Sequence, residues 1–305
     1  MIKALLISLL TATLAHAQYD ARTADYLRAW RIGAAGGELW TPAELGDDLA
    51  LWLDASDAST LWADTNATTA ATNNGTVARW DDKSGNDRNA VQSTPGARPT
   101  LLTDTLSTDG SDQLDVVKGG EIFRNVSNAS LIVVGKDSDP TGGDNLHMPV
   151  IFFTNPNQQL GRMHIRTRSA SSNFQAFGRR LDADTQVSTS NTELTTSSHI
   201  MIAFGDYSSG FLRSALDGSD YNSVAYSSGS GSTSDTDGGT AVIFRGLTPG
   251  QRMPANSTIS EVICVYNFSD EIKEKIEGYL AHKWGLTEKL PSDHPYKNKA
   301  PRKGE

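Results

Sequence analysis

Cysteine is nearly absent from this chain of 305 residues. Cys264 is the single one, so no intramolecular disulfide can form. This excludes a small secreted module held together by disulfides. Cys264 lies in an apolar run from Val262 to Val265, which predicts a small buried core residue rather than a reactive thiol.

Basic residues are scarce relative to acidic ones. The chain has 27 Lys and Arg against 36 Asp and Glu, for a formal net charge of −9. A nucleic-acid-binding protein carries a basic face that this balance does not provide, so we expect no nucleic acid among the partners. An acidic chain is instead compatible with divalent cations.

The motifs of common catalytic sites are missing as well. There is no G-x-S-x-G segment, P-loop or dinucleotide fingerprint, and the six histidines form no H-x-H or H-x-x-x-H pair that would bind zinc. Carboxylates two residues apart within an apolar strand, as β-sandwich glycosidases use, are not found; Asp182 with Asp184 and Asp235 with Asp237 have the spacing, but both pairs lie in polar loops. We therefore predict that the protein is not an enzyme, with a glycoside hydrolase as the remote alternative.

What the chain does contain is a long series of short strands. From about residue 49, apolar runs alternate with clusters of Gly, Asn, Asp and Ser, which favours a mainly β fold, a sandwich or jelly roll. The predicted strands are Leu49–Asp54, Val77–Asp81, Asn89–Gln92, Pro99–Thr103, Ser130–Gly135, Pro149–Thr154, Arg162–Thr167, Asn173–Gly178, His199–Phe204, Ser209–Leu216, Thr240–Arg245 and Thr258–Tyr266.

One amphipathic helix is predicted near the end of the chain. Ser269 is a suitable N-cap, and Gly285 ends the helix. A single apolar stripe is formed by Ile272, Ile276, Tyr279, Leu280 and Trp284. A segment with Pro291, His294 and Tyr296 follows, in which we expect His294 to fix the C-terminal turn.

Residues 1–45 are predicted to be a separate apolar helix and linker. Lys3 precedes an apolar run from Ala4 to Leu14, which is too short to span a bilayer. The A-x-A pattern at residues 15–17 is typical of a cleaved signal peptide. The alternative is a retained helix for docking or oligomerisation. Residues 298–305 are predicted to be a polar tail.

Several motifs in the chain resemble a known family. They are LWLDAS at 51–56, WDDKSGN at 80–86, NAVQ at 89–92, RPT at 98–100, ISEV at 259–262, IEGYLAHKWGL at 276–286 and LPSDHPY at 290–296. In these motifs, the stretch from residue 46 to residue 297 resembles the concanavalin A-like, LamG-like jelly-roll domains of tailed-phage virion proteins and marine bacterial surface proteins. The resemblance implies an antiparallel two-sheet sandwich and a role in carbohydrate binding, adhesion or structure.

From this resemblance we expect a non-catalytic virion protein of a tailed phage: a fibre, tail or capsid-decorating component at the virion surface. It would be a homo-oligomer that contacts other virion proteins through residues 1–45, and its jelly roll would bind a host surface glycan. The alternative is a secreted or cell-surface bacterial carbohydrate-binding or adhesion protein from which residues 1–17 are cleaved.

Two groups of residues are candidates for ligand contacts. For a glycan, the loops offer aromatic and polar side chains at Tyr207, Arg213, Tyr221, Asn222 and Tyr226, although tyrosine at a sheet edge is commonly structural. For a metal, Asp137, Asp139 and Asp144 share one Gly-rich loop and supply the oxygen ligands that Ca²⁺ prefers. Aspartate also favours turns for local reasons. We expect no required cofactor beyond this candidate structural calcium ion.

Overall fold

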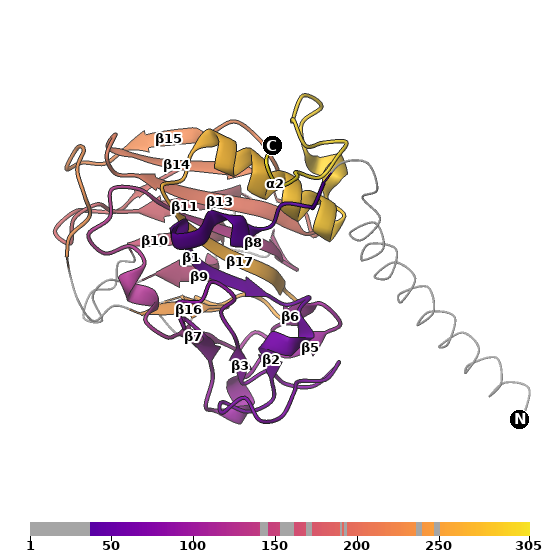
Figure 1. Ribbon diagram of the computed structural model, residues 1–305. Coiled ribbons are helices and arrows are strands. Elements are labelled where there is room, and N and C mark those ends of the chain that lie inside the picture. Colours follow the sequence, from indigo (N-terminus) through magenta and orange to yellow (C-terminus); the bar gives the residue numbers. More distant parts are fainter. Residues whose placement is uncertain are drawn as a thin grey trace, which may run out of the picture.

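The computed structural model describes residues 37–140, 146–152, 162–168, 173–189, 191, 194–235, 240–246 and 251–305. In this part of the chain, two antiparallel sheets stack face to face and one α-helix, α2 (Asp270–Trp284), lies on the outer face of one of them (Figure 1). The predicted fold class, a mainly β antiparallel sandwich with a C-terminal helix, is confirmed. The predicted N-terminal helix falls within residues 1–36, outside the described residues.

We call the sheet beneath α2 the front sheet. Among the described residues its strands run in the order β15 (Asn222–Ala225), β14 (Phe211–Leu216), β13 (His199–Asp206), β8 (Ala129–Lys136), β17 (Thr258–Tyr266), β6 (Thr105–Ser107) and β5 (Thr100–Leu102), and β1 (Leu49–Asp54) also pairs with β17. All of these pairs are antiparallel.

The second sheet, which we call the back sheet, is made mostly of shorter strands. Its order is β12 (Val187–Ser188), β11 (Asn173–Gly178), β10 (Met163–Arg168), β9 (Leu146–Phe152), β16 (Ala241–Ile243), β7 (Leu114–Val116), β4 (Ala90–Val91), β3 (Arg79–Trp80) and β2 (Leu61–Trp62). Short 3₁₀ turns join the strands: η1 (Pro42–Asp48), η2 (Ala58–Thr60), η3 (Pro95–Ala97), η4 (Gly119–Glu121) and η5 (Thr287–Lys289).

The central strands of the front sheet, β8, β13 and β17, are buried on both faces. In β8, Leu131 and Val133 point into the core between the sheets, whereas Ile132 and Val134 point outward into a second apolar cluster beneath α2. Because successive side chains of a strand point to opposite faces, a strand covered on both sides is apolar at every position. This explains the uninterrupted apolar runs of β8, β13 and β17.

The helix α2 forms as its sequence predicts. The Ser269 side chain accepts a hydrogen bond from the Ile272 amide, and Gly285 ends the helix in the left-handed conformation at φ 68°. Glu271 and Lys275 form an ion pair of 2.7 Å one turn apart. The helix is thus specified locally, and its apolar stripe fixes how it lies on the sheet.

The two ends of the described chain pack together. The Trp40 amide donates to the Pro301 carbonyl over 3.0 Å, and Leu39 pairs with Arg302 in an isolated β-bridge. The Trp40 ring lies edge-on to Tyr279 of α2, with centroids 6.2 Å apart. Both the segment from Leu39 to residue 45 and part of the predicted polar tail therefore belong to the folded domain.

The segment after α2 closes against the helix. Gly278 allows this approach, because a Cβ atom at that position would lie 2.4 Å from the Cβ of Tyr296. His294 lies 3.3 Å from the buried Glu277 carboxylate, and His282 is hydrogen-bonded to the Tyr296 carbonyl. The expectation that His294 fixes the C-terminal turn agrees with these contacts.

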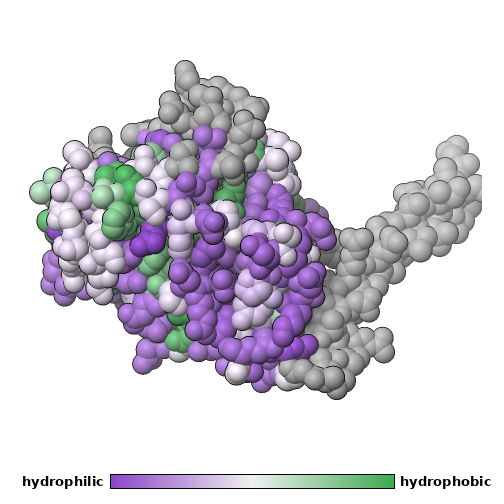
Figure 2. Space-filling model, turned by 90° about the horizontal axis from the view of Figure 1, so that it is seen from above, coloured by the Kyte–Doolittle hydropathy of each residue, from purple (hydrophilic) through white to green (hydrophobic). Residues whose placement is uncertain are grey.

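The outside of the sandwich is mainly polar. The face shown in Figure 2 is largely hydrophilic, with apolar residues only in scattered patches. Exposed large apolar side chains among the described residues are Leu102, Val117 and Phe211. No helix in the described part of the chain combines the length and apolar character that crossing a bilayer requires.

Candidate functional site

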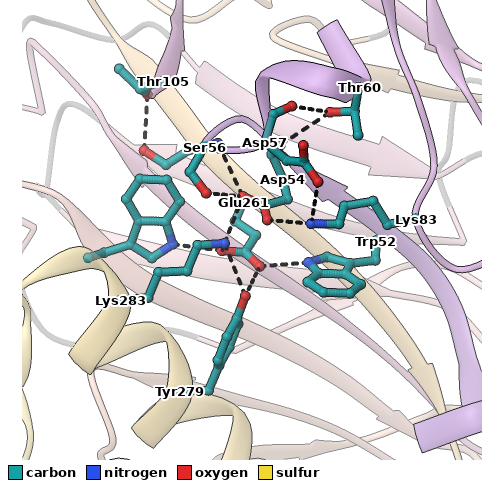
Figure 3. A network of polar contacts seen from close by, with 12 residues as sticks. Trp52, Asp54, Ser56, Asp57, Thr60, Lys83, Thr105, Glu261, Tyr279 and Lys283 are labelled. Atoms are coloured by element: carbon teal, nitrogen blue, oxygen red, sulfur yellow. Dashed lines mark hydrogen bonds and ion pairs between the residues drawn. The ribbon is translucent and has the colours of Figure 1, made fainter. Parts of the chain in front are cut away.

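Three segments far apart in the sequence meet where α2 crosses the front sheet. Strand β1 brings Trp52 and Asp54 to the outer face, and β17 brings Glu261, which lies opposite Asp54 in the antiparallel register. The last turns of α2 lay Tyr279 and Lys283 over them (Figure 3), and Trp284 also reaches Glu261. Charged residues thus occupy sheet positions beside the apolar cluster beneath α2.

Glu261 is the centre of the network. Its side chain is fully buried, and each carboxylate oxygen accepts two hydrogen bonds. Trp52 Nε1 and the Tyr279 hydroxyl donate to Oε1 over 2.7 and 3.1 Å, while Lys283 Nζ and Trp284 Nε1 donate to Oε2 over 2.8 and 2.7 Å. Burial raises the pKa of Glu261, and the ammonium group of Lys283 opposes this shift.

Two lysines hold the neighbouring carboxylates. Lys283 Nζ lies 2.7 Å from Asp54 Oδ1 as well as 2.8 Å from Glu261 Oε2. Lys83 Nζ lies 2.9 Å from both Asp54 and Asp57. Burial alone would raise the pKa of Asp54, but Lys283 and Lys83 together lower it to about 2. Asp54 is therefore paired on both of its oxygens.

A cleft of about 460 Å³ opens beside this network. Its lining residues are Thr41, Trp52, Asp54, Ser56, Asp57, Ala58, Ser59, Lys83, Tyr279 and Lys283. The mouth carries the exposed Ser56, Ala58 and Ser59, and the deeper wall carries the buried Trp52 and Tyr279. The volume lies in the range of small-molecule sites, and hydroxyls, carboxylates and ammonium groups converge on it.

The tyrosines predicted to contact a glycan lie elsewhere. Tyr207 and Tyr226 are 0% and 4% exposed and stack on each other inside the core between the sheets, 5.3 Å between centroids. This corrects their placement on exposed loops: each follows a front-sheet strand, where the ring turns inward because its apolar area is larger than its polar tip.

Arg213 and Tyr221 lie on the outer face of the front sheet, whereas Asn222 pairs with the inward-facing Ser214 and shares its side of the edge strand. Arg213 forms an ion pair of 3.0 Å with Asp206, and its guanidinium lies over the Tyr221 ring. Tyr221 packs against Phe204 and is half-buried, and Asn222 is exposed at the start of the edge strand β15. Arg213, Tyr221 and Asn222 are neighbours, but none of the five predicted residues lines the cleft.

The predicted calcium ligands do not converge in the part of the chain that the structure describes. Asp137 turns its carboxylate inward, 2.6 Å from His147 Nδ1, and also accepts a hydrogen bond from Thr167. Asp139 is exposed and its amide donates to Asp137, and Asp144 lies outside the described residues. Among the described residues, no three His, Cys, Asp or Glu side chains form a group that could hold a metal ion.

The sequence did contain a signal for the cleft. Asp54, Lys83 and Glu261 are charged residues within or beside apolar strands, and a buried charge requires a partner. Which partners these residues have depends on the strand register and on where α2 lies, and neither can be read from local pattern.

Comparison with known proteins shows the fold and nothing finer. No family model matches the chain, and no curated protein matches it in sequence. A Trypanosoma rangeli sialidase in complex with 2,3-difluorosialic acid superimposes with a TM-score of 0.53 at 11% identity, over 83% of this chain and 35% of the sialidase. The binding domain of botulinum neurotoxin serotype D gives 0.48 at 14% identity, over 77% and 52%.

A carbohydrate-binding module (CBM40) of a Ruminococcus gnavus sialidase bound to sialyllactose gives a TM-score of 0.43 at 11% identity, over 55% of this chain and 93% of the module. The chain spans about half the length of the neurotoxin domain and a third of the sialidase. The likeness to the sialidase extends to the antiparallel β-sandwich fold alone.

Proposed function

We propose that this protein is a non-catalytic carbohydrate-binding module and that the cleft between η2 and α2 is its ligand site. The observation that carries the proposal is the cleft itself: about 460 Å³, with the hydroxyls of Ser56 and Ser59 at its mouth and charged groups behind them. A polyhydroxylated ligand matches this lining, because each sugar hydroxyl both donates and accepts hydrogen bonds.

The state of Asp54 in the cleft and of Glu261 behind it supports binding rather than hydrolysis. A glycosidase needs one carboxylic acid and one carboxylate that both reach the scissile bond. Here both oxygens of Glu261 are taken by donors from Trp52, Tyr279, Lys283 and Trp284, and its side chain is 0% exposed. Asp54 is held ionised by two lysines and cannot donate a proton at neutral pH.

We place the module in a virion structural protein of a tailed phage, as a fibre, tail or capsid-decorating component. In this setting residues 1–45 dock a homo-oligomer to other virion proteins and the sandwich faces a host surface glycan. The support is the resemblance of the motifs around β1, β3 and α2. The alternative setting is a secreted or cell-surface bacterial adhesion protein. The N-terminal residue of the native protein distinguishes the two settings. A chain that retains Met1 supports the virion protein, and a chain that begins at Gln18 supports the secreted protein.

A glycan array probed with the full chain tests the binding proposal, with bacterial capsule and lipopolysaccharide glycans included. Hits are measured by calorimetry against two variants. Ala58→Trp places a large ring at the exposed mouth of the cleft and should weaken binding at least tenfold, a change of about 1.4 kcal/mol. Asn222→Trp adds the same ring at an exposed position away from the cleft and should leave binding unchanged.

The two variants separate the cleft from the site predicted at the tyrosines. Loss of binding in Asn222→Trp alone would assign the ligand to the surface around Tyr221 and Arg213 and would refute the cleft. A chain that binds no glycan on the array would refute the carbohydrate proposal itself.

A further inference from the structure

The buried network holds an amine, a carboxyl group and a second carboxylate in contact. We propose that Lys283 and Asp54 join spontaneously in an amide bond, assisted by Glu261, so that the mature domain carries an internal covalent cross-link between β1 and α2. This inference stands on the geometry of the network; where the amide forms, Asp54 and Lys283 line the cleft as a neutral amide, and the charged groups that remain in its lining are Asp57 and Lys83.

The amine and the carboxyl group are already in contact. Lys283 Nζ lies 2.7 Å from Asp54 Oδ1, which places the amine beside the carbonyl carbon that it would attack. In intramolecular reactions, reacting atoms about 3–3.5 Å apart give very high effective concentrations. Strand pairing fixes Asp54 opposite Glu261, and the helix fixes Lys283 between them.

The surroundings keep water from competing. Trp52 and Tyr279 are 6% and 5% exposed, and the side chains of Lys283 and Asp54 are 8% and 5% exposed. In such a site an ion pair bears a desolvation cost, and replacing it by a neutral amide removes two buried charges. Because Asp54 is mainly ionised, the reaction starts from the less populated protonation state, in which a proton has moved from the Lys283 ammonium group to the Asp54 carboxylate.

The steps balance without a further reactant. The proton transfer leaves a neutral amine and a carboxylic acid, and the nitrogen lone pair forms a bond to the Asp54 carbonyl carbon. The Glu261 carboxylate, 2.8 Å from the nitrogen, takes a proton from it and returns the proton to the leaving hydroxyl. The carbon–oxygen bond breaks, one water molecule leaves through the adjoining cleft, and the new amide N–H remains beside Glu261.

A second lysine also reaches Asp54, and the structure distinguishes the two. Lys83 Nζ lies 2.9 Å from Asp54 Oδ2, but its side chain is 23% exposed and its other carboxylate, Asp57, is 33% exposed. Lys83 is therefore closer to solvent. Lys283 lies between Asp54 and the fully buried Glu261, which is placed to accept its proton.

The experiment is the intact mass of the full chain, purified and denatured, followed by tandem mass spectrometry of its tryptic peptides. We expect a mass lower than the sequence requires by one water molecule (about 18 Da) and a branched peptide that joins Asp54 to Lys283. Lys283→Arg and Glu261→Gln should restore the full mass, with folding confirmed by circular dichroism.

Three further variants sharpen the result. Asp54→Asn would release ammonia instead of water and give the same product mass as the cross-linked wild type. Lys83→Arg should keep the loss of water. So should Lys273→Arg, a matched control, because Lys273 pairs with the buried Glu277 on the same helix, 2.9 Å apart. A wild-type chain at its full mass, or a water loss that persists in Lys283→Arg, would overturn the cross-link.

Discussion

Gly278 offers a sharp test of how the C-terminal segment closes the domain. It lies in the interior of α2, where glycine is less favourable than alanine by about 1 kcal/mol. Helix propensity alone therefore predicts that Gly278→Ala stabilises the protein. The structure predicts the opposite sign, because the new Cβ would lie 2.4 Å from Tyr296 Cβ and 2.8 Å from its Cγ.

The magnitude follows from these two opposing effects. Forcing an extra methyl group into a packed contact costs about 1–3 kcal/mol, and more where the neighbour cannot shift. Tyr296 is held by the hydrogen bond that its carbonyl accepts from His282 Nε2, so the methyl must displace backbone as well as side chain. Because both contacts are shorter than 3 Å, we take the upper part of this range, about 2–3 kcal/mol, and subtracting the gain of about 1 kcal/mol in helix propensity leaves an expected net loss of about 1–2 kcal/mol in the free energy of unfolding.

Urea unfolding followed by tryptophan fluorescence measures this loss. Gly96→Ala is the control, since a Cβ at Gly96 meets no atom within 4 Å and should be nearly neutral. In a Tyr296→Gly background, which removes the opposing Cβ, Gly278→Ala should become stabilising. A Gly278→Ala chain more stable than the wild type, or one whose effect is unchanged in that background, would show that the helix does not approach the C-terminal segment as described.

Three other measurements address the buried polar groups. Trp284→Phe removes one hydrogen-bond donor from Glu261. The free energy of unfolding in urea should fall by about 1.5–3 kcal/mol, as for other hydrogen bonds to a charged group. A fall of less than about 0.5 kcal/mol would contradict the network. Burial alone would raise the pKa of Asp137, but its hydrogen bonds with His147 and Thr167 lower the pKa overall. The stability that the ionised Asp137 contributes should therefore be lost as the pH falls below 3.8, the ordinary pKa of aspartate. Asp137→Asn should reduce this loss of stability in acid. Burial also raises the pKa of Tyr207 and Tyr226, so ultraviolet titration should show these two ionising only as the chain unfolds in alkali, and early ionisation would place them at the surface.

The long strands and the helix could be predicted from sequence because their signals are local. Strands β1, β11 and β17 have the predicted bounds, and the caps of α2 are those its sequence requires. The strands that were missed, β2, β6, β7, β12 and β15, have two to four residues, too few to show alternation. Their existence depends on partners contributed by distant parts of the chain.

The candidate site was harder to predict for the same reason. Tyr207 and Tyr226 have the composition of a glycan platform, but only the tertiary fold shows that their rings turn inward. Asp54 and Glu261 are 207 positions apart in the numbering and become neighbours through the pairing of β1 with β17. Residue type indicated that these buried charges need partners, and only the register identified which ones.

The meeting of the two ends has a mechanical consequence. Tension applied to the chain at residues 37 and 305 acts first on the bridge between Leu39 and Arg302, whose hydrogen bonds open one after another rather than all at once. The terminal segments should peel away under low force until β1 and α2 carry the tension. If an amide joins Asp54 to Lys283, extension ends there, and the sandwich between these two residues is shielded from any pull that reaches it through its ends.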